Sequence, residues 1–180
     1  MSITIFAEGR HDLRSAGQAA SGFPPSGTIT AGNAPGLNSA AAAMIVADRA
    51  FAKARSVEPM ARLVAYGVAA VEPGMFGLGP VPAVRKTLER ARWKLSDVER
   101  IEINEAFAAV PLAVAQELGL PEDIINVEGG AIAHGHPIGA TGAVLTTRLL
   151  HAMRREGIRR GMVTLCIGGG QGIALALEGI

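Results

Sequence analysis

The chain has 180 residues, of which 49% are hydrophobic and 18% charged, so it carries enough apolar surface for a folded core, and wholesale disorder is excluded. Seventeen Lys and Arg against sixteen Asp and Glu give a net charge of +1, which argues against nucleic acid as a partner. A single cysteine, Cys166, excludes an internal disulfide framework and a multi-cysteine metal cluster. It favours a reducing compartment, for which we expect the cytosol.

Residues 1–26 are predicted to be an extension or linker, with a short strand at 2–7, because glycines interrupt them and two prolines end them. The apolar residues 3–7 are too few for a signal h-region or a membrane span, so no membrane association is expected. Residues 27–180 are expected to form one domain.

Helical and strand patterns alternate along the rest of the chain. Helices are expected at 40–54, 80–95, 105–118 and 143–156. Strands are expected at 44–46, interrupting the first helix, at 62–71 as a buried strand, and at 98–103, 162–167 and 173–177. The last two strands form a hairpin around a glycine turn. The predicted class is α/β, with a mixed β-sheet flanked by helices.

Asn104 lies where a strand is expected to run into a helix. Functional side chains are common at this position, because open α/β sheets present the carboxyl ends of their strands to ligands. The more frequent role of an asparagine there is a helix N-cap, and both roles remain open.

His134 and His136 form an H-x-H pair in a glycine-rich passage. In an extended chain both rings would lie on one face and could begin a zinc site, but a third ligand is missing, so no metal is expected. A histidine among glycines can instead exchange protons near neutral pH, while the alternative is a histidine in a surface loop.

Cys166 ends an apolar run and is followed by a turn with four glycines, residues 168–172. A buried, inert thiol is one interpretation. The other is a reactive thiol, because backbone N–H groups of a glycine turn can stabilise a thiolate and a substrate oxyanion. The turn leads into a strand, so a nucleotide-binding loop is not favoured.

Three separated segments together carry a family resemblance: NEAF at 104–107, GGAIAHGHPIGATG at 129–142 and CIGGGQG at 166–172. In this order they resemble the carboxyl-terminal half of the thiolase family, and TAGN at 30–33 and GLGP at 77–80 extend the match. The resemblance implies a thiolase-like α/β half and an acyl-CoA acyltransferase of fatty acid metabolism. Such enzymes cleave 3-ketoacyl-CoA with CoA or condense two acyl-CoA molecules in reverse.

The resemblance also implies roles for five residues. His136 would activate a nucleophilic cysteine, and Asn104 would hold a water that forms one oxyanion hole with His136. Cys166 would move the proton at the substrate α-carbon, the N–H of Gly168 would serve a second oxyanion hole, and Phe107 would lie beside the pantetheine arm. CoA is then a substrate, and no cofactor or metal is implied.

Three local features depart from the family pattern: His134 replaces an apolar or small residue, Pro35 replaces a serine near CoA that many members carry, and Asn38-Ser39-Ala40 replaces the common N-D-G. The acyl-accepting cysteine belongs to the family's amino-terminal half, and Cys166 is already assigned. The chain is therefore expected to be inactive without such a half, and to associate with one or with itself. The alternative is a noncatalytic module that binds CoA or serves assembly.

Overall fold

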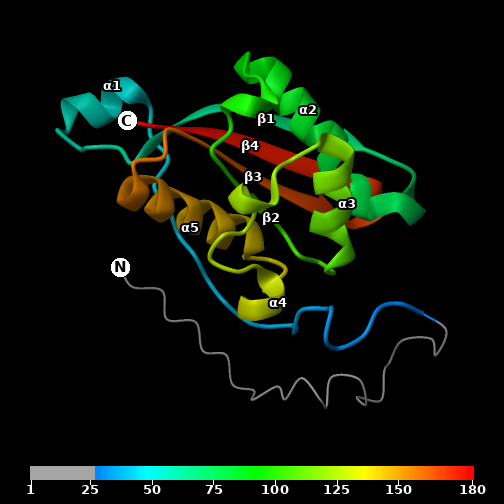
Figure 1. Ribbon diagram of the computed structural model, residues 1–180. Coiled ribbons are helices and arrows are strands. Elements are labelled where there is room, and N and C mark those ends of the chain that lie inside the picture. Colours follow the sequence, from blue (N-terminus) through cyan, green and yellow to red (C-terminus); the bar gives the residue numbers. More distant parts are fainter. Residues whose placement is uncertain (1–26) are drawn as a thin grey trace.

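The strands form one mixed sheet in the computed structural model, which describes residues 27–180 (Figure 1). Its strands are β1 (Ala61–Ala70), β2 (Arg100–Ile103), β3 (Arg160–Ile167) and β4 (Gln171–Gly179), in the spatial order β1-β4-β3-β2. β2 is parallel to β3, whereas β4 is antiparallel to both of its neighbours. The predicted α/β class with a mixed sheet is confirmed. The extension predicted at 1–26 lies outside the described residues.

Helices cover both faces of the sheet (Figure 1). On one face, α2 (Pro80–Ala91) and α3 (Ala109–Leu118) form a core with Ile101, Ile103 and Met162 of the strands. On the other face, α5 (Thr141–Glu156) packs on Val163 and Leu177. Burial of apolar side chains on both faces drives this layered arrangement.

Glycines end the helices α3 and α5. Gly119 and Gly157 follow α3 and α5 with φ of 69° and 70°, the left-handed conformation that glycine adopts without cost. The helix expected at 80–95 ends earlier, at Ala91, because Arg92 is left-handed, and the 3-10 helix η2 (Leu95–Asp97) follows. The short helices α4 (Ala131–His134) and η3 (Glu122–Ile124) were not predicted.

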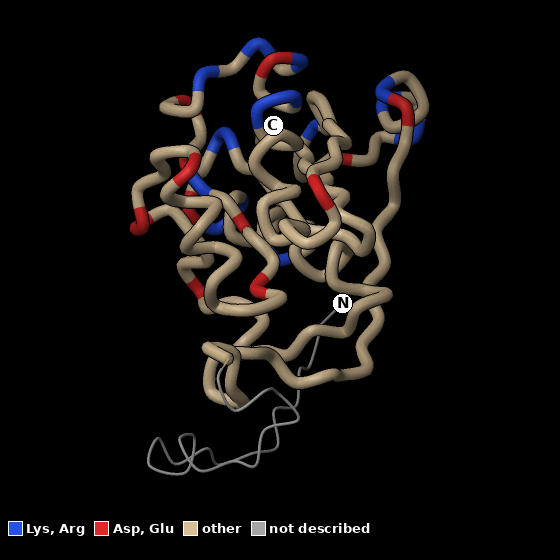
Figure 2. Tube along the Cα trace, turned by 90° about the vertical axis from the view of Figure 1, so that its right-hand side faces the viewer, with Lys and Arg blue, Asp and Glu red and all other residues tan. Residues whose placement is uncertain are grey.

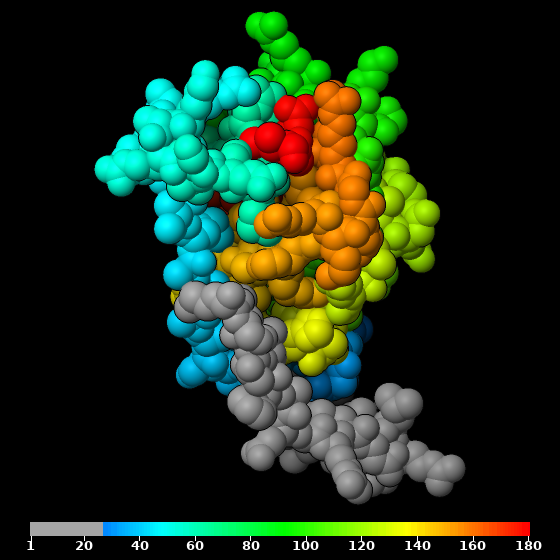
Figure 3. All heavy atoms as spheres, turned by 90° about the vertical axis from the view of Figure 1, so that its left-hand side faces the viewer, coloured from blue at the N-terminus to red at the C-terminus, as the bar shows by residue number. Residues whose placement is uncertain are grey.

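The prediction for residues 40–54 is wrong in its first part. Only α1 (Arg49–Ala54) is helical, and residues 40–48 form neither helix nor strand. Ile45 and Val46 are 96% and 79% exposed, because no described strand pairs with this apolar segment. Figure 3 shows that the light blue to cyan part of the chain lies on the outside of the domain.

The strand predicted at 62–71 forms as β1, but the prediction that it is buried is wrong. β1 lies at the edge of the sheet, and Leu63, Tyr66 and Val68 are 49%, 54% and 41% exposed. Lys86 and Arg90 of α2 donate to the carbonyls of Val68 and Tyr66, at 3.0 and 2.7 Å, and so satisfy backbone acceptors of this edge strand.

The predicted hairpin is confirmed: β3 and β4 are antiparallel and the 3-10 helix η4 (Gly168–Gly170) joins them. Beyond the turn, the backbone of β4 meets the start of α2. A Cβ on Gly172 would overlap the carbonyl oxygen of Gly79, and a Cβ on Gly79 would lie 2.6 Å from the carbonyl oxygen of Gln171. Glycine is therefore required at both positions.

We expect Gly172→Ala to lower the free energy of unfolding by about 1–3 kcal/mol, because two backbones must separate to admit the methyl group. The matched control is Gly139→Ala, whose Cβ would meet no atom within 4 Å; it should change stability by less than about 0.5 kcal/mol. Urea denaturation of both variants measures the difference, and equal midpoints would show that the contact is not restrictive.

Candidate active site

The parallel pairing of β2 with β3 brings Asn104 and Cys166 to the same edge of the sheet. Ile103 pairs with Thr164, and the N–H of Asn104 donates to the Thr164 carbonyl at 3.0 Å. Cys166 is therefore near the level of Asn104 on the neighbouring strand. The N-cap of α3 is Ala108 and not Asn104, so the N-cap interpretation of Asn104 is wrong.

His136 reaches this edge from the glycine-rich segment 129–136, called the catalytic loop below after the role that the resemblance implies for His136. Asn104 Nδ2 lies 3.4 Å from His136 Nε2. The N–H of His136 donates to the carbonyl of Gly36 at 3.0 Å, which ties the loop to the segment after the TAGN motif. A Cβ on Gly135 would overlap the side chain of Asn38, so that asparagine packs directly on the loop backbone.

Thr141, which sequence analysis missed, determines which nitrogen of His136 carries the proton. The hydroxyl of Thr141 donates to the carbonyl of Pro137 at 2.9 Å, so its oxygen is left to accept from His136 Nδ1 at 2.8 Å. The Nδ1–H tautomer leaves a lone pair on Nε2, which faces the side-chain Nδ2–H of Asn104. His136 is thus arranged as a base at Nε2. The histidine and threonine are five residues apart, and that spacing is the only signal in the sequence.

Burial changes the acid–base properties of the site in two directions. It lowers the pKa of His136, which favours the neutral imidazole, and it raises the pKa of Cys166, which favours the thiol. The shift of Cys166 is opposite to the one expected for a reactive thiolate. Asn104 is 1% exposed, and its Oδ1 accepts no hydrogen bond from the described residues.

The two histidines of the H-x-H pair have separate partners. The chain is helical through His134, and Gly135 has φ of 91°, so the expected extended pair with both rings on one face does not form. A ring nitrogen of His134 lies 2.8 Å from the carbonyl oxygen of Glu128. Within residues 27–180, no three His, Cys, Asp or Glu side chains gather as a metal site.

Phe107 is half-buried and packs edge-on against Phe76, with ring centroids 6.4 Å apart. The N–H of Ala108 donates to the carbonyl of Asn33 at 2.9 Å. The structure therefore brings together residues near the TAGN, GLGP and NEAF motifs, which are far apart in the sequence. Gly168 is exposed in the turn after Cys166.

Two segments near the site carry no charged side chains of their own. Residues 27–47 and 129–147 contain no Lys, Arg, Asp or Glu. Figure 2 shows charged residues gathered toward one end of the domain and uncharged chain at the other. Charge that develops in such a site must be stabilised by hydrogen bonds and dipoles.

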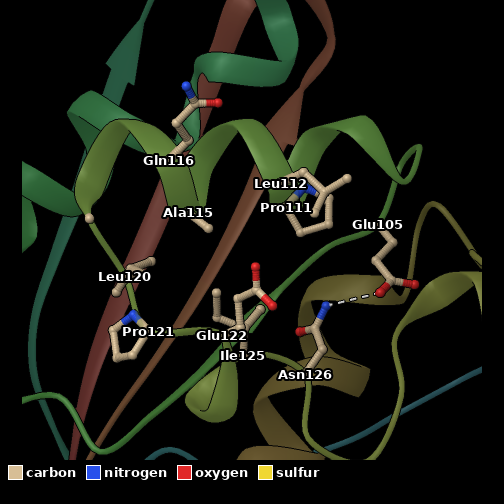
Figure 4. Close-up of a pocket in the computed structure, with 11 residues that line it drawn as sticks. Glu105, Pro111, Leu112, Ala115, Gln116, Leu120, Pro121, Glu122, Ile125 and Asn126 are labelled. Carbon is tan, nitrogen blue, oxygen red and sulfur yellow. Dashed lines mark hydrogen bonds between the residues drawn. The ribbon is translucent and has the colours of Figure 1, made fainter.

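A pocket of about 800 Å³ lies beside α3 and contains none of the predicted site residues (Figure 4). It is lined by apolar residues together with Glu105, Gln116, Glu122 and Asn126. Asn104 and His136 lie instead where the end of β2 meets the catalytic loop, and Cys166 is near the end of the neighbouring strand β3.

Glu102, two residues before Asn104, is buried beneath the catalytic loop. Its Oε2 lies 3.7 Å from Nη1 of Arg148, whose Nη2 donates to the carbonyl of Gly129 at 2.7 Å. Burial raises the pKa of Glu102 to about 7, although Arg148 and Arg100 oppose this shift. A carboxyl group that is neutral in part at pH 7 therefore lies under the site.

Within residues 27–180, the helices are all too short or too polar to cross a membrane.

Residues 57–179 match the family model described as "Thiolase, C-terminal domain". The chain is 51% identical over 158 residues to an acetyl-CoA acetyltransferase of Shinella zoogloeoides, which covers 88% of this chain and 40% of that protein.

Solved structures give the same result. The crystal structure of the Bacillus anthracis acetyl-CoA acetyltransferase matches with a TM-score of 0.86 and 47% identity, over 88% of this chain and 40% of that chain. The human mitochondrial 3-ketoacyl-CoA thiolase in complex with CoA matches with a TM-score of 0.80 and 40% identity, with the same coverage. The chain thus spans about two fifths of the length of these relatives.

We expect Thr141→Val to remove the preference of His136 for the Nδ1–H tautomer, because valine cannot accept a hydrogen bond from Nδ1–H. Nitrogen-15 NMR of the imidazole should show mixed tautomers in this variant and the Nδ1–H form in the unsubstituted chain. Thr141→Ser keeps the hydroxyl and should keep that form. Loss of the Nδ1–H form in the serine variant too would contradict the assigned hydrogen bond.

We expect the contribution of Glu102 to the stability of the chain to fall as pH rises from about 4.5 to 7, because unfolded Glu102 ionises while folded Glu102 still holds its proton. Glu102→Gln removes this contribution, so the two free energies of unfolding should diverge by up to about 3 kcal/mol over that interval. Urea denaturation at several pH values measures it, and parallel pH profiles would contradict the raised pKa.

Proposed function

Because the chain belongs to the thiolase family, as a carboxyl-terminal thiolase domain, we propose that it supplies His136, Asn104 and Cys166 to an acyl-CoA C-acyltransferase. The reaction is cleavage of a 3-ketoacyl-CoA by CoA, or the reverse Claisen condensation. The contact between Asn104 and His136, with the tautomer set by Thr141, is the observation that carries this proposal. The names of the relatives, one of them in complex with CoA, support the substrate class.

His136 acts first as a general base. Its lowered pKa keeps Nε2 unprotonated near neutral pH, so it takes the proton of the nucleophilic thiol. The thiolate attacks the ketone carbon of the substrate, and Nε2–H of the resulting imidazolium then donates to the oxygen that becomes negative. Thr141 keeps Nδ1 engaged throughout, so the ring cannot turn away.

Asn104 completes the oxyanion hole. Its buried Oδ1, which no described residue satisfies, can accept one O–H of a water molecule, and the water's other O–H then points to the substrate oxygen. On the other side of the reacting atoms, the N–H of Gly168 serves a second oxyanion hole. Because residues 129–147 contain no Lys, Arg, Asp or Glu, these dipoles and the imidazolium of His136 carry the stabilisation.

Cys166 acts as an acid when the carbon–carbon bond breaks. Its raised pKa keeps the proton on sulfur, ready for the α-carbon of the leaving enolate. The thiol of CoA then attacks the acyl group on the nucleophile and gives its proton to the Cys166 thiolate. The nucleophile leaves as a thiolate and regains the proton held by His136, so both thiols are restored.

The nucleophilic thiol must come from outside the 180 residues, because Cys166 is the only cysteine among them and is occupied with the proton. We place it on an amino-terminal thiolase half. Gly67 and Ala174 face α2, so the adjacent pairs Tyr66–Leu175 and Val68–Ile173 point to the opposite face of the sheet. Tyr66 and Val68 are exposed there, which leaves apolar surface for that half.

We expect negligible thiolysis by the 180-residue chain alone. Co-expression with the amino-terminal half of the Shinella zoogloeoides acetyl-CoA acetyltransferase should yield a complex that cleaves acetoacetyl-CoA with CoA. In that complex, Cys166→Ala and His136→Ala should each lower kcat by about 10² to 10⁴ and leave assembly intact.

The matched control is His151→Ala on the exposed side of α5, which should leave kcat unchanged. Turnover by the chain alone, with an acyl group found on Cys166 by mass spectrometry, would make Cys166 the nucleophile. It would overturn the proposal that a second thiol carries the acyl group while Cys166 moves the proton. Binding of CoA by the complex without any turnover would support a noncatalytic module instead. The cytosolic location and the absence of a cofactor stay predictions.

A further inference from the structure

We propose that Glu105 is a positioning residue that holds the catalytic loop against the carboxyl end of β2 and thereby sets the contact between Asn104 and His136. This inference deepens the proposed function and rests on it. Glu105 follows Asn104 directly, and its side chain reaches the start of the loop that carries His136. Its carboxylate hydrogen-bonds to Asn126 and to the backbone of Ile132, so it acts on His136 through the loop backbone.

The carboxylate of Glu105 bridges two segments. Its Oε2 accepts the N–H of Ile132 at 2.8 Å, in the first turn of α4, four residues before His136. Its Oε1 accepts from Nδ2 of Asn126 at 3.3 Å (Figure 4). A carboxylate that accepts hydrogen bonds from two fixed donors has one orientation, which fixes α4 relative to β2.

Asn126 fixes the other side of the same strand end. It is left-handed, with φ of 45°, and its N–H donates to the carbonyl of Ile101 at 3.1 Å. Its side-chain amide pairs with both backbone groups of Ile103, accepting from the N–H and donating to the carbonyl, each at 2.8 Å. Asn104 is thus flanked by two residues, Ile103 and Glu105, that segment 126–132 holds.

Gly130 shows how closely the carboxylate packs on the loop. A Cβ at this position would overlap all three carboxyl atoms of Glu105. The backbone of Gly130 has φ of −112° and ψ of −161°, an extended conformation that alanine adopts without strain. Glycine is therefore needed at this position for the side chain of Glu105 and not for the backbone.

The contact between Glu105 and Gly130 can be tested by a double-mutant cycle in which each substitution changes one of its two partners. Glu105→Ala removes the carboxylate, and Gly130→Ala displaces it. If the carboxylate is what Gly130 accommodates, Gly130→Ala has nothing left to displace once Glu105 is alanine, so the double variant should equal Glu105→Ala alone. Gly139→Ala, in open space on the same glycine-rich passage, is the control and should match the unsubstituted chain.

The first readout is the pKa of His136, measured by NMR titration of its imidazole in the 180-residue chain. We expect both single variants to move this pKa from its lowered value toward 6.5, as the ring leaves its half-buried place, and Glu105→Gln to retain the lowered value because its oxygen still accepts from Ile132. A merely structural role would lower the urea midpoint and leave the pKa of His136 unchanged, which would overturn the proposal. If Glu105→Ala does not fold, the comparison of Gly130→Ala with Gly139→Ala decides the question by the same measurement.

The second readout is thiolysis by the complex with the amino-terminal half. We expect each single variant to lower kcat by about tenfold or more with little change in KM, because misplacement of a catalytic group affects the chemical step. A full additional loss from Gly130→Ala in the Glu105→Ala background would overturn the proposal. A complex that is inactive in every form, with the NMR cycle as expected, would leave Glu105 as a positioning residue and refute the proposed function.

Discussion

The parallel ladder between β2 and β3 is the constraint on which the site depends. Parallel strands end at the same edge of a sheet, so Asn104 and Cys166 lie at neighbouring strand ends although 62 positions separate them in the sequence. The connection between these strands must return across the sheet, and it is this connection that carries the catalytic loop and α5. The parallel pairing of β2 with β3 therefore brings the NEAF and CIGGGQG motifs to one end of the sheet, and the connection between these strands carries the third motif.

The electrostatics of the site follow from the same arrangement. Because residues 129–147 carry no formal charge, His136 and Cys166 feel mainly desolvation, which lowers the pKa of the imidazole and raises that of the thiol. The imidazole can then accept a proton and the thiol can donate one at the same pH, as the proposed reaction requires. Two opposite proton transfers in one reaction need such a pair.

Local signals in the sequence predicted much of the fold, whereas strand pairing and burial depend on contacts with distant parts of the chain. Gly119 and Gly157 marked helix ends correctly because the left-handed conformation is a local property. Residues 40–48 were predicted wrongly because a strand needs a partner, and the burial of 62–71 was wrong because hydropathy does not reveal a sheet edge. The three motifs gave Asn104 and His136, which the structure places in contact. The support from Thr141 depends on the fold of the loop and carries no motif of its own.

Glycine is required in the catalytic loop for two different physical reasons, which the sequence does not distinguish. Gly129 and Gly135 have φ of 83° and 91°, so their backbone conformation disfavours other residues, and at Gly135 the side chain of Asn38 fills the space of a Cβ as well. Gly130 has an extended backbone conformation that other residues adopt. Glycine is required there only because the carboxylate of Glu105 occupies the space of a Cβ. A glycine-rich loop is thus held rigid by side chains from other elements packed onto its backbone. Such a loop can present a histidine with the accuracy that proton transfer requires, although its own sequence would suggest flexibility.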